Sequence, residues 1–302
     1  MFSDLLRQGG LSFDRLQSFC RVAQAGGVTR AAKGDPARQS LFSRQIKELE
    51  EFFGLELIRR KGRGVVLTPA GQRLNAVARE CFASLLDFRN ESKGLPVVVV
   101  IGAGESTIQW LLMARLEEIR KQMPKLRLKF LNLATSEAVK RLADGAIDFA
   151  VVRRDAVARP LQAKSLGIMS YSLFVPEGLQ SPNGCKDRLK MLAGLPLATL
   201  EGEGNFRNAL SSVARKTGFK LNIQIECSSF PLASRAVATG KVAAILPTVA
   251  VGDLEGMGVT RVAAPFLKTF DREMCLASNA RLLRIRPMLL NVAEALGRVC
   301  QF

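Results

Sequence analysis

The 302-residue sequence contains no histidine and only one tryptophan and one tyrosine. Without histidine, serine–histidine and cysteine–histidine nucleophile pairs and histidine-ligated metals are excluded. No apolar run reaches the roughly 18 residues that a membrane-spanning helix needs. The first residues, which include Asp4 and Arg7, lack the apolar core of an export signal. We therefore expect a cytoplasmic protein with no membrane partner, no metal and no cofactor.

Paired cysteine motifs are also missing. The six cysteines lie at positions 20, 81, 185, 227, 275 and 300, and they form no CxxC pair. Four of them fall in apolar periodic stretches, which favours reduced thiols packed in a core. A redox-sensing pair, for instance Cys185 with Cys227, stays open as an alternative.

Positive charge, in contrast, is abundant. The formal net charge is +17 and the isoelectric point is about 10.2. Such an excess favours a polyanionic partner whose binding weakens as salt rises. Lys and Arg outnumber Asp and Glu in both the N-terminal third and the remainder of the chain. Net charge therefore indicates the kind of partner without locating the site.

The N-terminal stretch has the pattern of three short helices. A first helix through residues 16–23 should end at Gly26-Gly27, and a second should cover residues 28–32. Asp35 is a candidate N-cap and Pro36 suits the first position of a third helix, which Gly54 should end. The apolar residues that we expect on the inner side of this third helix are Leu41, Phe42, Ile46, Leu49 and Phe53.

The outer side of the third helix carries side chains that hydrogen-bond base edges and phosphates. A cationic turn at residues 59–64 then leads into a short strand at residues 65–67, which reads as a wing. A helix-turn-helix places such a helix in the DNA major groove. The alternative is a solvated, charged helix face. The residues that we predict to contact DNA are Thr29, Arg30, Gln39, Ser40, Ser43, Arg44, Lys47, Arg60 and Arg63.

A long helix should follow, because Thr68 is a good N-cap and Pro69 suits the first helical position. Its apolar residues recur by four and three, and Gly94 and Pro96 close the segment. This spacing favours pairing with a second chain, and packing against the protein's own domain is the alternative. The predicted seam consists of Leu74, Ala78, Cys81, Leu85 and Phe88.

From residue 97 onward, strands alternate with helices, which is typical of a parallel α/β sheet. The predicted strands are 97–101, 126–133, 147–152, 161–166, 171–175, 221–226, 242–246 and 274–277. The predicted helices are one through residues 108–119 and those at 135–143, 206–216, 230–238 and 287–299.

The N-terminal stretch resembles the LysR-type transcriptional regulators, and the match is ungapped. The matching positions are Thr29–Ala32, Gln39, Ser43–Ile46, Glu48–Glu50, Phe53-Gly54, Leu57, Arg60 and Leu67–Gly71. Three positions depart from the family pattern. Gly27 replaces a capping serine, Asp35 replaces a buried leucine, and Arg38 replaces the serine or threonine that caps the recognition helix. Asp35 is expected to take over that capping.

The resemblance implies an N-terminal all-α winged helix-turn-helix in residues 1–67 and a linker and dimerisation helix in residues 68–94. It also implies an α/β bilobed effector-binding domain, like periplasmic binding proteins, in residues 95–302. Lobe one would be residues 95–163 and 269–302, and lobe two residues 164–268. The implied partners are double-stranded DNA, a small-molecule effector and further copies of the chain, as a homodimer or homotetramer.

Ligands of bilobed folds bind between the lobes, beside strand ends and helix N-termini, which favour anions. Arg153 ends a predicted strand, and several hydroxyl side chains begin predicted helices. Simple helix capping is the alternative for each of those hydroxyls. We predict a small, anionic, carboxylate-bearing effector. The candidate residues are Ser106, Thr107, Thr135, Ser136, Arg153, Ser228, Ser229, Phe230 and Pro247.

Two other readings remain open. The chain could be a bilobed sensor or binding protein without a DNA role, although neither an export signal nor a tether is visible. It could also be a cysteine-dependent enzyme that uses Cys227, with Cys185 and Cys300 less suited. Gly102-Ala103-Gly104 resembles the start of a dinucleotide-binding motif, but Thr107 stands where its third glycine belongs, so we interpret the match as spurious.

Overall fold

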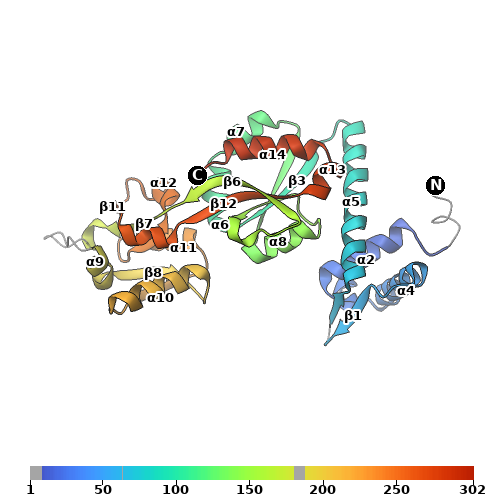
Figure 1. Ribbon diagram of the computed structural model, residues 1–302, viewed down its shortest axis with the longest axis horizontal. Helices are drawn as coiled ribbons and strands as arrows, with labels where there is room; N and C mark the ends of the chain where they lie inside the picture. Colours follow the sequence, from blue (N-terminus) through green and yellow to red (C-terminus); the bar gives the residue numbers. More distant parts are fainter. Residues whose placement is uncertain (1–8, 63, 180–187) are drawn as a thin grey trace.

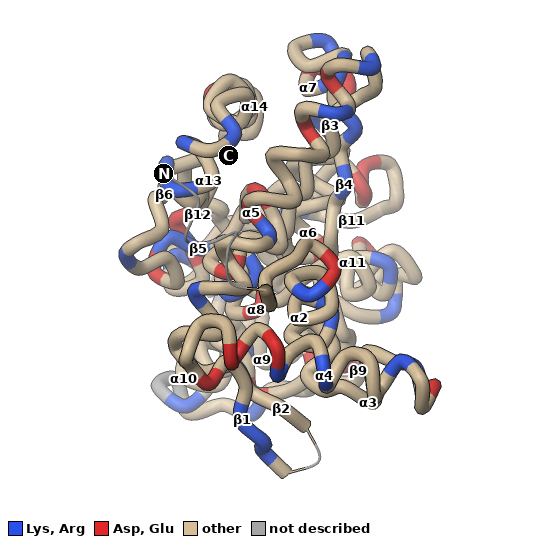
Figure 2. Tube along the Cα trace, turned by 90° about the vertical axis from the view of Figure 1, so that its right-hand side faces the viewer, with Lys and Arg blue, Asp and Glu red and all other residues tan. Residues whose placement is uncertain are grey.

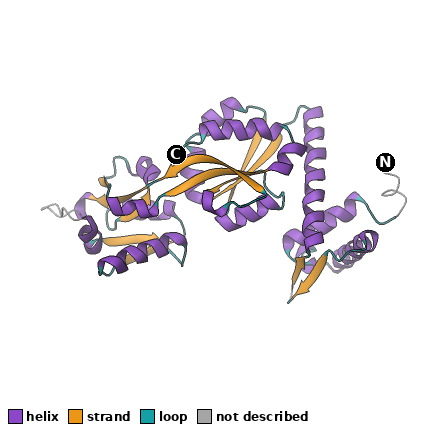
Figure 3. Cartoon of the chain, viewed as in Figure 1, coloured by secondary structure: helices purple, strands orange, loops and turns teal. Residues whose placement is uncertain are grey.

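The computed structural model describes residues 9–62, 64–179 and 188–302. Figure 1 shows a small N-terminal unit, a long helix and an elongated α/β domain. The N-terminal unit is mainly helical, with one two-stranded hairpin (Figure 3). Its elements are α2 (Phe13–Ala25), α3 (Val28–Ala31), α4 (Pro36–Phe53), β1 (Ile58–Lys61) and β2 (Gly64–Leu67). The predicted three helices and wing are thus confirmed.

Local capping explains why α4 begins and ends where it does. The carboxylate of Asp35 accepts hydrogen bonds from the backbone N–H groups of Ala37 and Arg38, at 3.0 and 3.4 Å. Asp35 therefore caps α4, as predicted. Gly54 ends the helix with a φ of +64°, a left-handed conformation that glycine adopts without strain.

The inner side of α4 packs on α2 around Phe19, Phe42, Ile46 and Leu49, all of which are buried. The prediction was wrong for Leu41, which is 37% exposed. The helical spacing of the apolar residues predicted that Leu41 faces inward beside Phe42. In the structure Leu41 is not among the buried residues of α4. Leu41 therefore lies on the outer part of the helix.

The long helix α5 spans Pro69–Ser92, and the Thr68 hydroxyl caps it by accepting from the backbone N–H of Gly71. Only glycine fits at position 71, because a Cβ there would collide with the carbonyl of Leu57. The predicted apolar seam is divided between two directions. Leu74 packs against the core of the N-terminal unit, and Ala78 is buried. The apolar residues of α5 that remain exposed are Val77, Cys81, Leu85, Leu86 and Phe88.

Lobe one is built on a five-stranded sheet in the order β4-β3-β5-β12-β6. Strands β3, β4 and β5 run parallel, and β12 is antiparallel to both β5 and β6. Helices α7 and α14 lie on one face of the sheet and α8 on the other (Figure 1). The strands are β3 (Val97–Ala103), β4 (Leu126–Asn132), β5 (Phe149–Arg153), β6 (Leu161–Met169) and β12 (Arg272–Asn279). The helices are α6 (Glu105–Thr107), the π-helical η1 (Ile108–Met113), α7 (Leu116–Gln122), α8 (Thr135–Ala143), η2 (Arg154–Ala156), α13 (Ala280–Ile285) and α14 (Met288–Val299).

Lobe two has a three-stranded sheet, β10-β7-β11, and a parallel pair, β8-β9, which an isolated bridge between Leu197 and Ala243 connects. Strands β6 and β12 are the two connections between the lobes. The strands are β7 (Tyr171–Pro176), β8 (Pro196–Leu200), β9 (Asn222–Cys227), β10 (Ala244–Pro247) and β11 (Val259–Val262). The helices are η3 (Glu177–Leu179), α9 (Arg188–Gly194), α10 (Asn205–Thr217), α11 (Phe230–Ala238), η4 (Thr248–Ala250), α12 (Val251–Leu254) and η5 (Pro265–Phe270).

The largest apolar core runs through both lobes. It joins buried residues of lobe one, such as Phe149 and Leu111, to residues of lobe two, such as Leu173 and Leu210. Within the described residues, no helix is both long and apolar enough to cross a membrane. The predicted fold class, a winged helix-turn-helix followed by an α/β bilobed domain, is confirmed.

The cysteines in the described ranges are free thiols, and Cys20, Cys227, Cys275 and Cys300 are buried, whereas Cys81 is exposed. Burial raises the pKa of Cys227, and it raises the pKa values of Cys275 and Cys300 to about 11. A thiol with a raised pKa holds little thiolate at neutral pH and is a poor nucleophile. Cys185 lies outside the described residues, so the predicted alternative of a Cys185–Cys227 pair stays untested.

Candidate functional sites

The outer side of α4 forms an exposed, polar and cationic surface. Ser40, Ser43, Arg44 and Lys47 are exposed there, and Gln39 is half-buried. The two cations have only weak partners on the same helix: Arg44 lies 3.8 Å from Glu48, and Lys47 lies 3.6 Å from Glu51. Exposed pairs of this kind contribute less than about 1 kcal/mol, so the cations can exchange them for other anions.

Helix α3 and the hairpin adjoin this surface. The side chain of Arg30 donates to the carbonyl oxygen of Gly26, and the backbone N–H of Val65 donates to the same oxygen at 3.0 Å. Arg30 thus helps to fix the wing to α3, a structural role that the sequence did not suggest. Thr29 and Arg60 are exposed, and Figure 2 shows Lys and Arg along β1. Arg63 lies outside the described residues.

A second candidate site is a pocket of about 610 Å³ between the two lobes. Lobe one supplies residues from the end of β5 and the start of β12, and lobe two supplies residues from the first turn of α10. We call it the arginine pocket. Its lining residues are Arg153, Arg154, Asp155, Asn205, Asn208, Asp271, Arg272 and Glu273.

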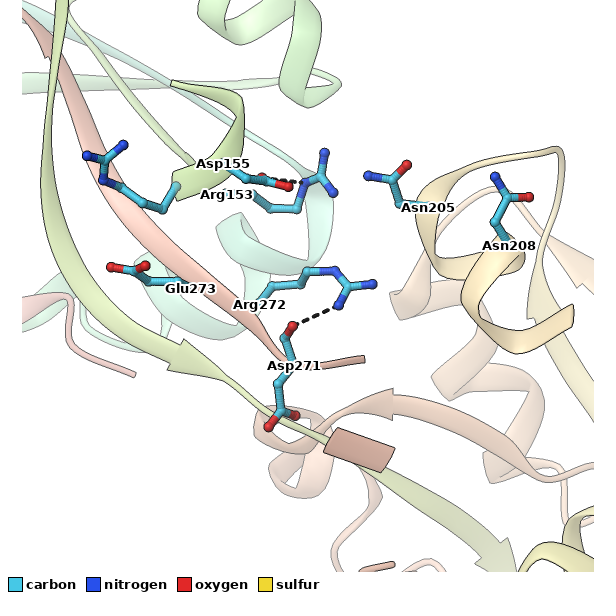
Figure 4. A pocket seen from close by; sticks show the side chains of 8 residues that line it. Arg153, Asp155, Asn205, Asn208, Asp271, Arg272 and Glu273 are labelled. Atoms are coloured by element: carbon cyan, nitrogen blue, oxygen red, sulfur yellow. Dashed lines mark hydrogen bonds and ion pairs between the residues drawn. The ribbon is translucent and has the colours of Figure 1, made fainter. Parts of the chain in front are cut away.

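Two guanidinium groups point into the arginine pocket toward Asn205, whereas the Asp271 carboxylate points away (Figure 4). Arg153 lies 3.7 Å from Asp155. With the amide oxygen of Asn205 turned toward it, Arg153 also donates to that oxygen at 3.0 Å, which links the lobes. Arg272 donates to the backbone carbonyl of Asp271 at 2.7 Å, which fixes its direction.

An aromatic cluster lies beside these arginines. Tyr171 packs against Phe206, Phe230 and Phe270, with ring centroids 5.8, 5.7 and 6.1 Å away. Burial raises the pKa of Tyr171, and the positive charges of Arg272 and Arg153 oppose that shift. The phenol is therefore neutral and lies within range of both charges.

The N-terminus of α10 also faces this site. Its N-cap, Gly204, has no side chain, so the first N–H groups of this 13-residue helix receive no side-chain cap. Such groups carry partial positive charge and favour anions. Two arginines and the uncapped N–H groups of α10 give the arginine pocket the donors that a carboxylate or another oxyanion requires.

Of the nine predicted effector residues, Arg153 lines the arginine pocket and the others are not among its lining residues. Ser229 caps α11 by accepting from the backbone N–H of Leu232 at 3.4 Å. Phe230 belongs to the aromatic cluster beside the pocket. The remaining six lie at strand and helix ends: Ser106 and the buried Thr107 in α6, Thr135 and Ser136 in the first turn of α8, the exposed Ser228 before α11, and the buried Pro247 at the end of β10. Their roles in effector binding stay predictions.

Sequence reasoning missed Arg272, Asn205 and Asn208 in the pocket, and Tyr171, Phe206 and Phe270 beside it. A weak signal existed for one of them, because Asp271-Arg272-Glu273 is a charged triplet directly before a buried strand. The described residues contain no group of three or more His, Cys, Asp and Glu side chains that could hold a metal ion.

Comparison with known proteins gives these two sites a family context. Residues 13–72 match the family described as bacterial regulatory helix-turn-helix protein, lysR family. Residues 94–300 match the LysR substrate binding domain. A probable nitrogen assimilation transcriptional activator of Synechococcus elongatus is 27% identical over 254 residues, which cover 80% of this chain and 81% of the relative. The HTH-type transcriptional regulator TdcA of Escherichia coli is 31% identical over 44% of each chain.

Solved structures show the same fold. ArgP from Mycobacterium tuberculosis superimposes with a TM-score of 0.70 at 17% identity, covering 96% of this chain and 97% of that one. Full-length CbnR complexed with its target DNA gives a TM-score of 0.59 at 19% identity, covering 96% and 100%. The class of protein is therefore a winged helix-turn-helix joined to a bilobed sensory domain. The chain belongs to the LysR family of DNA-binding transcriptional regulators with an effector-binding domain.

Proposed function

We propose that this chain is a sequence-specific regulator of the cytoplasm whose homodimer or homotetramer holds half-sites of double-stranded DNA. The exposed outer side of α4 carries the proposal, because its polar and cationic side chains are free to reach base edges and phosphates. Arg44 is the side chain expected to read a base, and Lys47 and Arg60 are expected to contact phosphates. Thr29 and Arg30 of α3 complete the proposed surface. Arg63, outside the described residues, stays a predicted DNA contact.

A second copy of the chain is needed to grip two half-sites. The support for such a partner is the exposed apolar stripe on α5, which includes Val77, Leu85 and the 70% exposed Phe88. Contiguous apolar surface of this kind is uncommon on monomers and marks association sites. We propose that this stripe pairs with the same stripe of a partner.

The arginine pocket is proposed to bind a small anionic effector, carboxylate-bearing by default. The effector would bridge Arg153 and Arg272 of lobe one to the N-terminus of α10 in lobe two. A ligand that contacts both lobes stabilises one lobe arrangement over others, and this differential binding is what can alter DNA affinity or spacing. We propose no enzymatic role, since the buried Cys227 has a raised pKa and would be a poor nucleophile.

The DNA proposal is tested with Arg44→Ala and a matched control, Arg120→Ala. Arg120 is exposed on α7, far from α4 in Figure 1. A preferred duplex would be selected from genomic fragments and compared with a random duplex across a salt series. Arg44→Ala should weaken binding to the selected duplex about tenfold or more and reduce the preference over random DNA. Equal affinities for Arg44→Ala and Arg120→Ala would reject the proposed role of Arg44.

The effector proposal is tested by a thermal-shift screen of carboxylate and phosphate metabolites on the full chain. An anion that raises the melting temperature should lose this effect in Arg153→Ala and in Arg272→Ala, because each variant removes one guanidinium of the pocket. Lys129→Ala, which removes an exposed cation from the edge strand β4, is the control and should respond like the wild type. A response that survives both arginine variants would exclude this pocket as the site.

A further inference from the structure

The single tryptophan of the sequence belongs to one lobe but is buried in the other. Trp110 lies in the π-helical segment η1 of lobe one and is 6% exposed. Its indole packs in a core cluster whose other buried members, such as Phe174, Val237 and Leu246, come from lobe two. The burial of Trp110 therefore depends on how the two lobes are arranged.

A polar contact holds the same indole. Trp110 donates its Nε1–H to the carboxylate oxygen Oδ2 of Asp253 at 2.8 Å. The side-chain amide of Gln109 donates to the same oxygen at 2.6 Å. Asp253 belongs to α12 of lobe two, and within the described residues it has no cationic partner. Two neutral donors from lobe one thus hydrogen-bond to this carboxylate. Hydrogen bonds to a charged acceptor are stronger than those between neutral groups, which strengthens the contact between the lobes.

The contact lies outside the arginine pocket, because none of its three residues lines that pocket. Both sites nevertheless depend on the same variable, the separation of the lobes. Arg153 and Arg272 lie on lobe one, and Asn205 and Asn208 lie on lobe two, so movement of one lobe changes the width of the pocket. π-Helical turns such as η1 are rare and are frequently found at functional sites.

We propose that Gln109, Trp110 and Asp253 form an inter-lobe latch that positions the two walls of the arginine pocket and so sets effector affinity. These are positioning residues, since they do not line the pocket. The latch and a bridging anion stabilise the same closed arrangement, and each therefore strengthens the other. The effector part of this inference rests on the proposed function, whereas the latch itself can be tested without any ligand.

The first experiment uses the tryptophan as its own reporter in the full-length protein. Asp253→Ala removes the acceptor, and Glu255→Ala, which removes an exposed carboxylate directly after α12, is the matched control. In Asp253→Ala the emission maximum should move to longer wavelength, and the acrylamide quenching constant should rise about threefold or more, because opening exposes the indole. Glu255→Ala should match the wild type.

Two further variants separate a latch from a general loss of structure. Asp253→Asn keeps an acceptor oxygen and should retain most of the protection from acrylamide. Trp110→Phe keeps an aromatic ring but loses the N–H donor, and hydrogen exchange should then become faster in η1 and α12 and remain unchanged in α5. If Asp253→Ala quenches like the wild type, the latch is overturned whatever the effector screen shows.

The second experiment measures the coupling with an anion that stabilises the wild type in the thermal-shift screen. Its dissociation constant should be about tenfold higher for Asp253→Ala, because part of the binding energy must now close the lobes. Glu255→Ala should bind as the wild type does. Increased quenching with an unchanged dissociation constant would overturn the positioning role. Failure of every anion to bind the wild type would count against the effector proposal. The acrylamide quenching of Asp253→Ala would then still show whether the latch exists.

Discussion

Two junctions connect the parts of this molecule, and they are built from different chemistry. At the first, α5 meets lobe one through buried charges. Arg286, which follows α13, is 6% exposed and donates to Asp87 of α5 at 3.1 Å. It also donates to the carboxylate of Asp148 and, at 3.3 Å, to the carbonyl of Val98. A nearby ion pair joins Glu80 of α5 to Arg281 at 2.8 Å.

The second junction, between the lobes, has no comparable buried ion cluster among the described residues. Trp110 of lobe one is buried among apolar residues of lobe two, charged side chains line the arginine pocket, and the aromatic cluster of lobe two lies beside that pocket. The rings of Phe206 and Phe230 meet at 4.9 Å, and Phe206 also contacts Phe270 at 5.1 Å. Side-chain polar links across this junction, among the described residues, include the contacts of Asp253 with Trp110 and Gln109 and the contact between Arg153 and Asn205. The arginine pocket, with a volume of about 610 Å³, opens beside these links.

The difference indicates which junction can move. A buried arginine that is shared by two carboxylates fixes direction and distance, and leaving any member unpaired is costly. Aromatic rings, in contrast, pack in several offset and tilted geometries of similar energy. We therefore expect α5 and lobe one to move as one body and lobe two to move against it. An effector in the arginine pocket would act on this second, softer junction.

The largest expected effect comes from breaking the first junction. Arg286→Met leaves Asp87 and Asp148 buried without their cation, so the free energy of unfolding should fall by about 3–5 kcal/mol. Urea unfolding followed by circular dichroism measures this. Arg284→Met, which removes an exposed arginine of α13, should change stability by no more than about 0.5 kcal/mol. Similar losses in the two variants would show that the buried cluster is not the stronger junction.

A smaller effect is expected in the aromatic cluster beside the second junction. Phe206→Ala removes a half-buried ring that contacts Tyr171, Phe230 and Phe270, so stability should fall by about 2 kcal/mol, less than for a fully buried phenylalanine. Hydrogen exchange should become faster in β7 and α11 and stay unchanged in α5. Faster exchange in α5 as well would mean that the two junctions are not independent. Phe13→Ala, a change of an exposed ring outside this junction, is the control.

The two regions also differ in how far the sequence predicts them. The N-terminal unit was predicted almost completely, because its boundaries depend on local signals such as the Asp35 cap and Gly54. The errors in this unit concern the direction in which apolar side chains face, and not the position of the helices. The spacing of Leu41, Leu74 and Ala78 shows that these residues share helix faces with other apolar residues, but it does not tell whether a face meets the protein's own core, solvent or a partner.

The effector domain was predicted as an order of strands and helices, whereas the sequence singled out only Arg153 among the residues that line the arginine pocket. That residue ends a buried strand, so topology alone brings it to the inter-lobe edge. The other important contacts join distant positions. Trp110 and Asp253 are 143 residues apart, and Arg286 and Asp87 are 199 apart. No periodicity or capping signal connects such positions, because each pair depends on how whole lobes pack.

The smallest expected effect is a pH dependence of the first junction. Burial raises the pKa of Asp148, and the Arg286 guanidinium and the backbone N–H of Val100 oppose that shift. The folded protein therefore holds this proton more strongly than the unfolded chain. The resulting contribution to stability is complete below the ordinary aspartate pKa of about 3.9 and is lost as pH rises through the raised value.

Asp148→Asn removes this titration, so the unfolding free energy of the wild type minus that of the variant should decrease as pH rises from about 4 to about 7. The slope cannot exceed about 1.4 kcal/mol per pH unit for one proton. Glu255→Gln, at an exposed position, should give a difference that stays flat over the same range. A wild-type advantage that grows with pH would mean that Arg286 outweighs burial at Asp148. The attraction between Arg286 and Asp148 would then contribute more to the first junction than the burial of Asp148 costs.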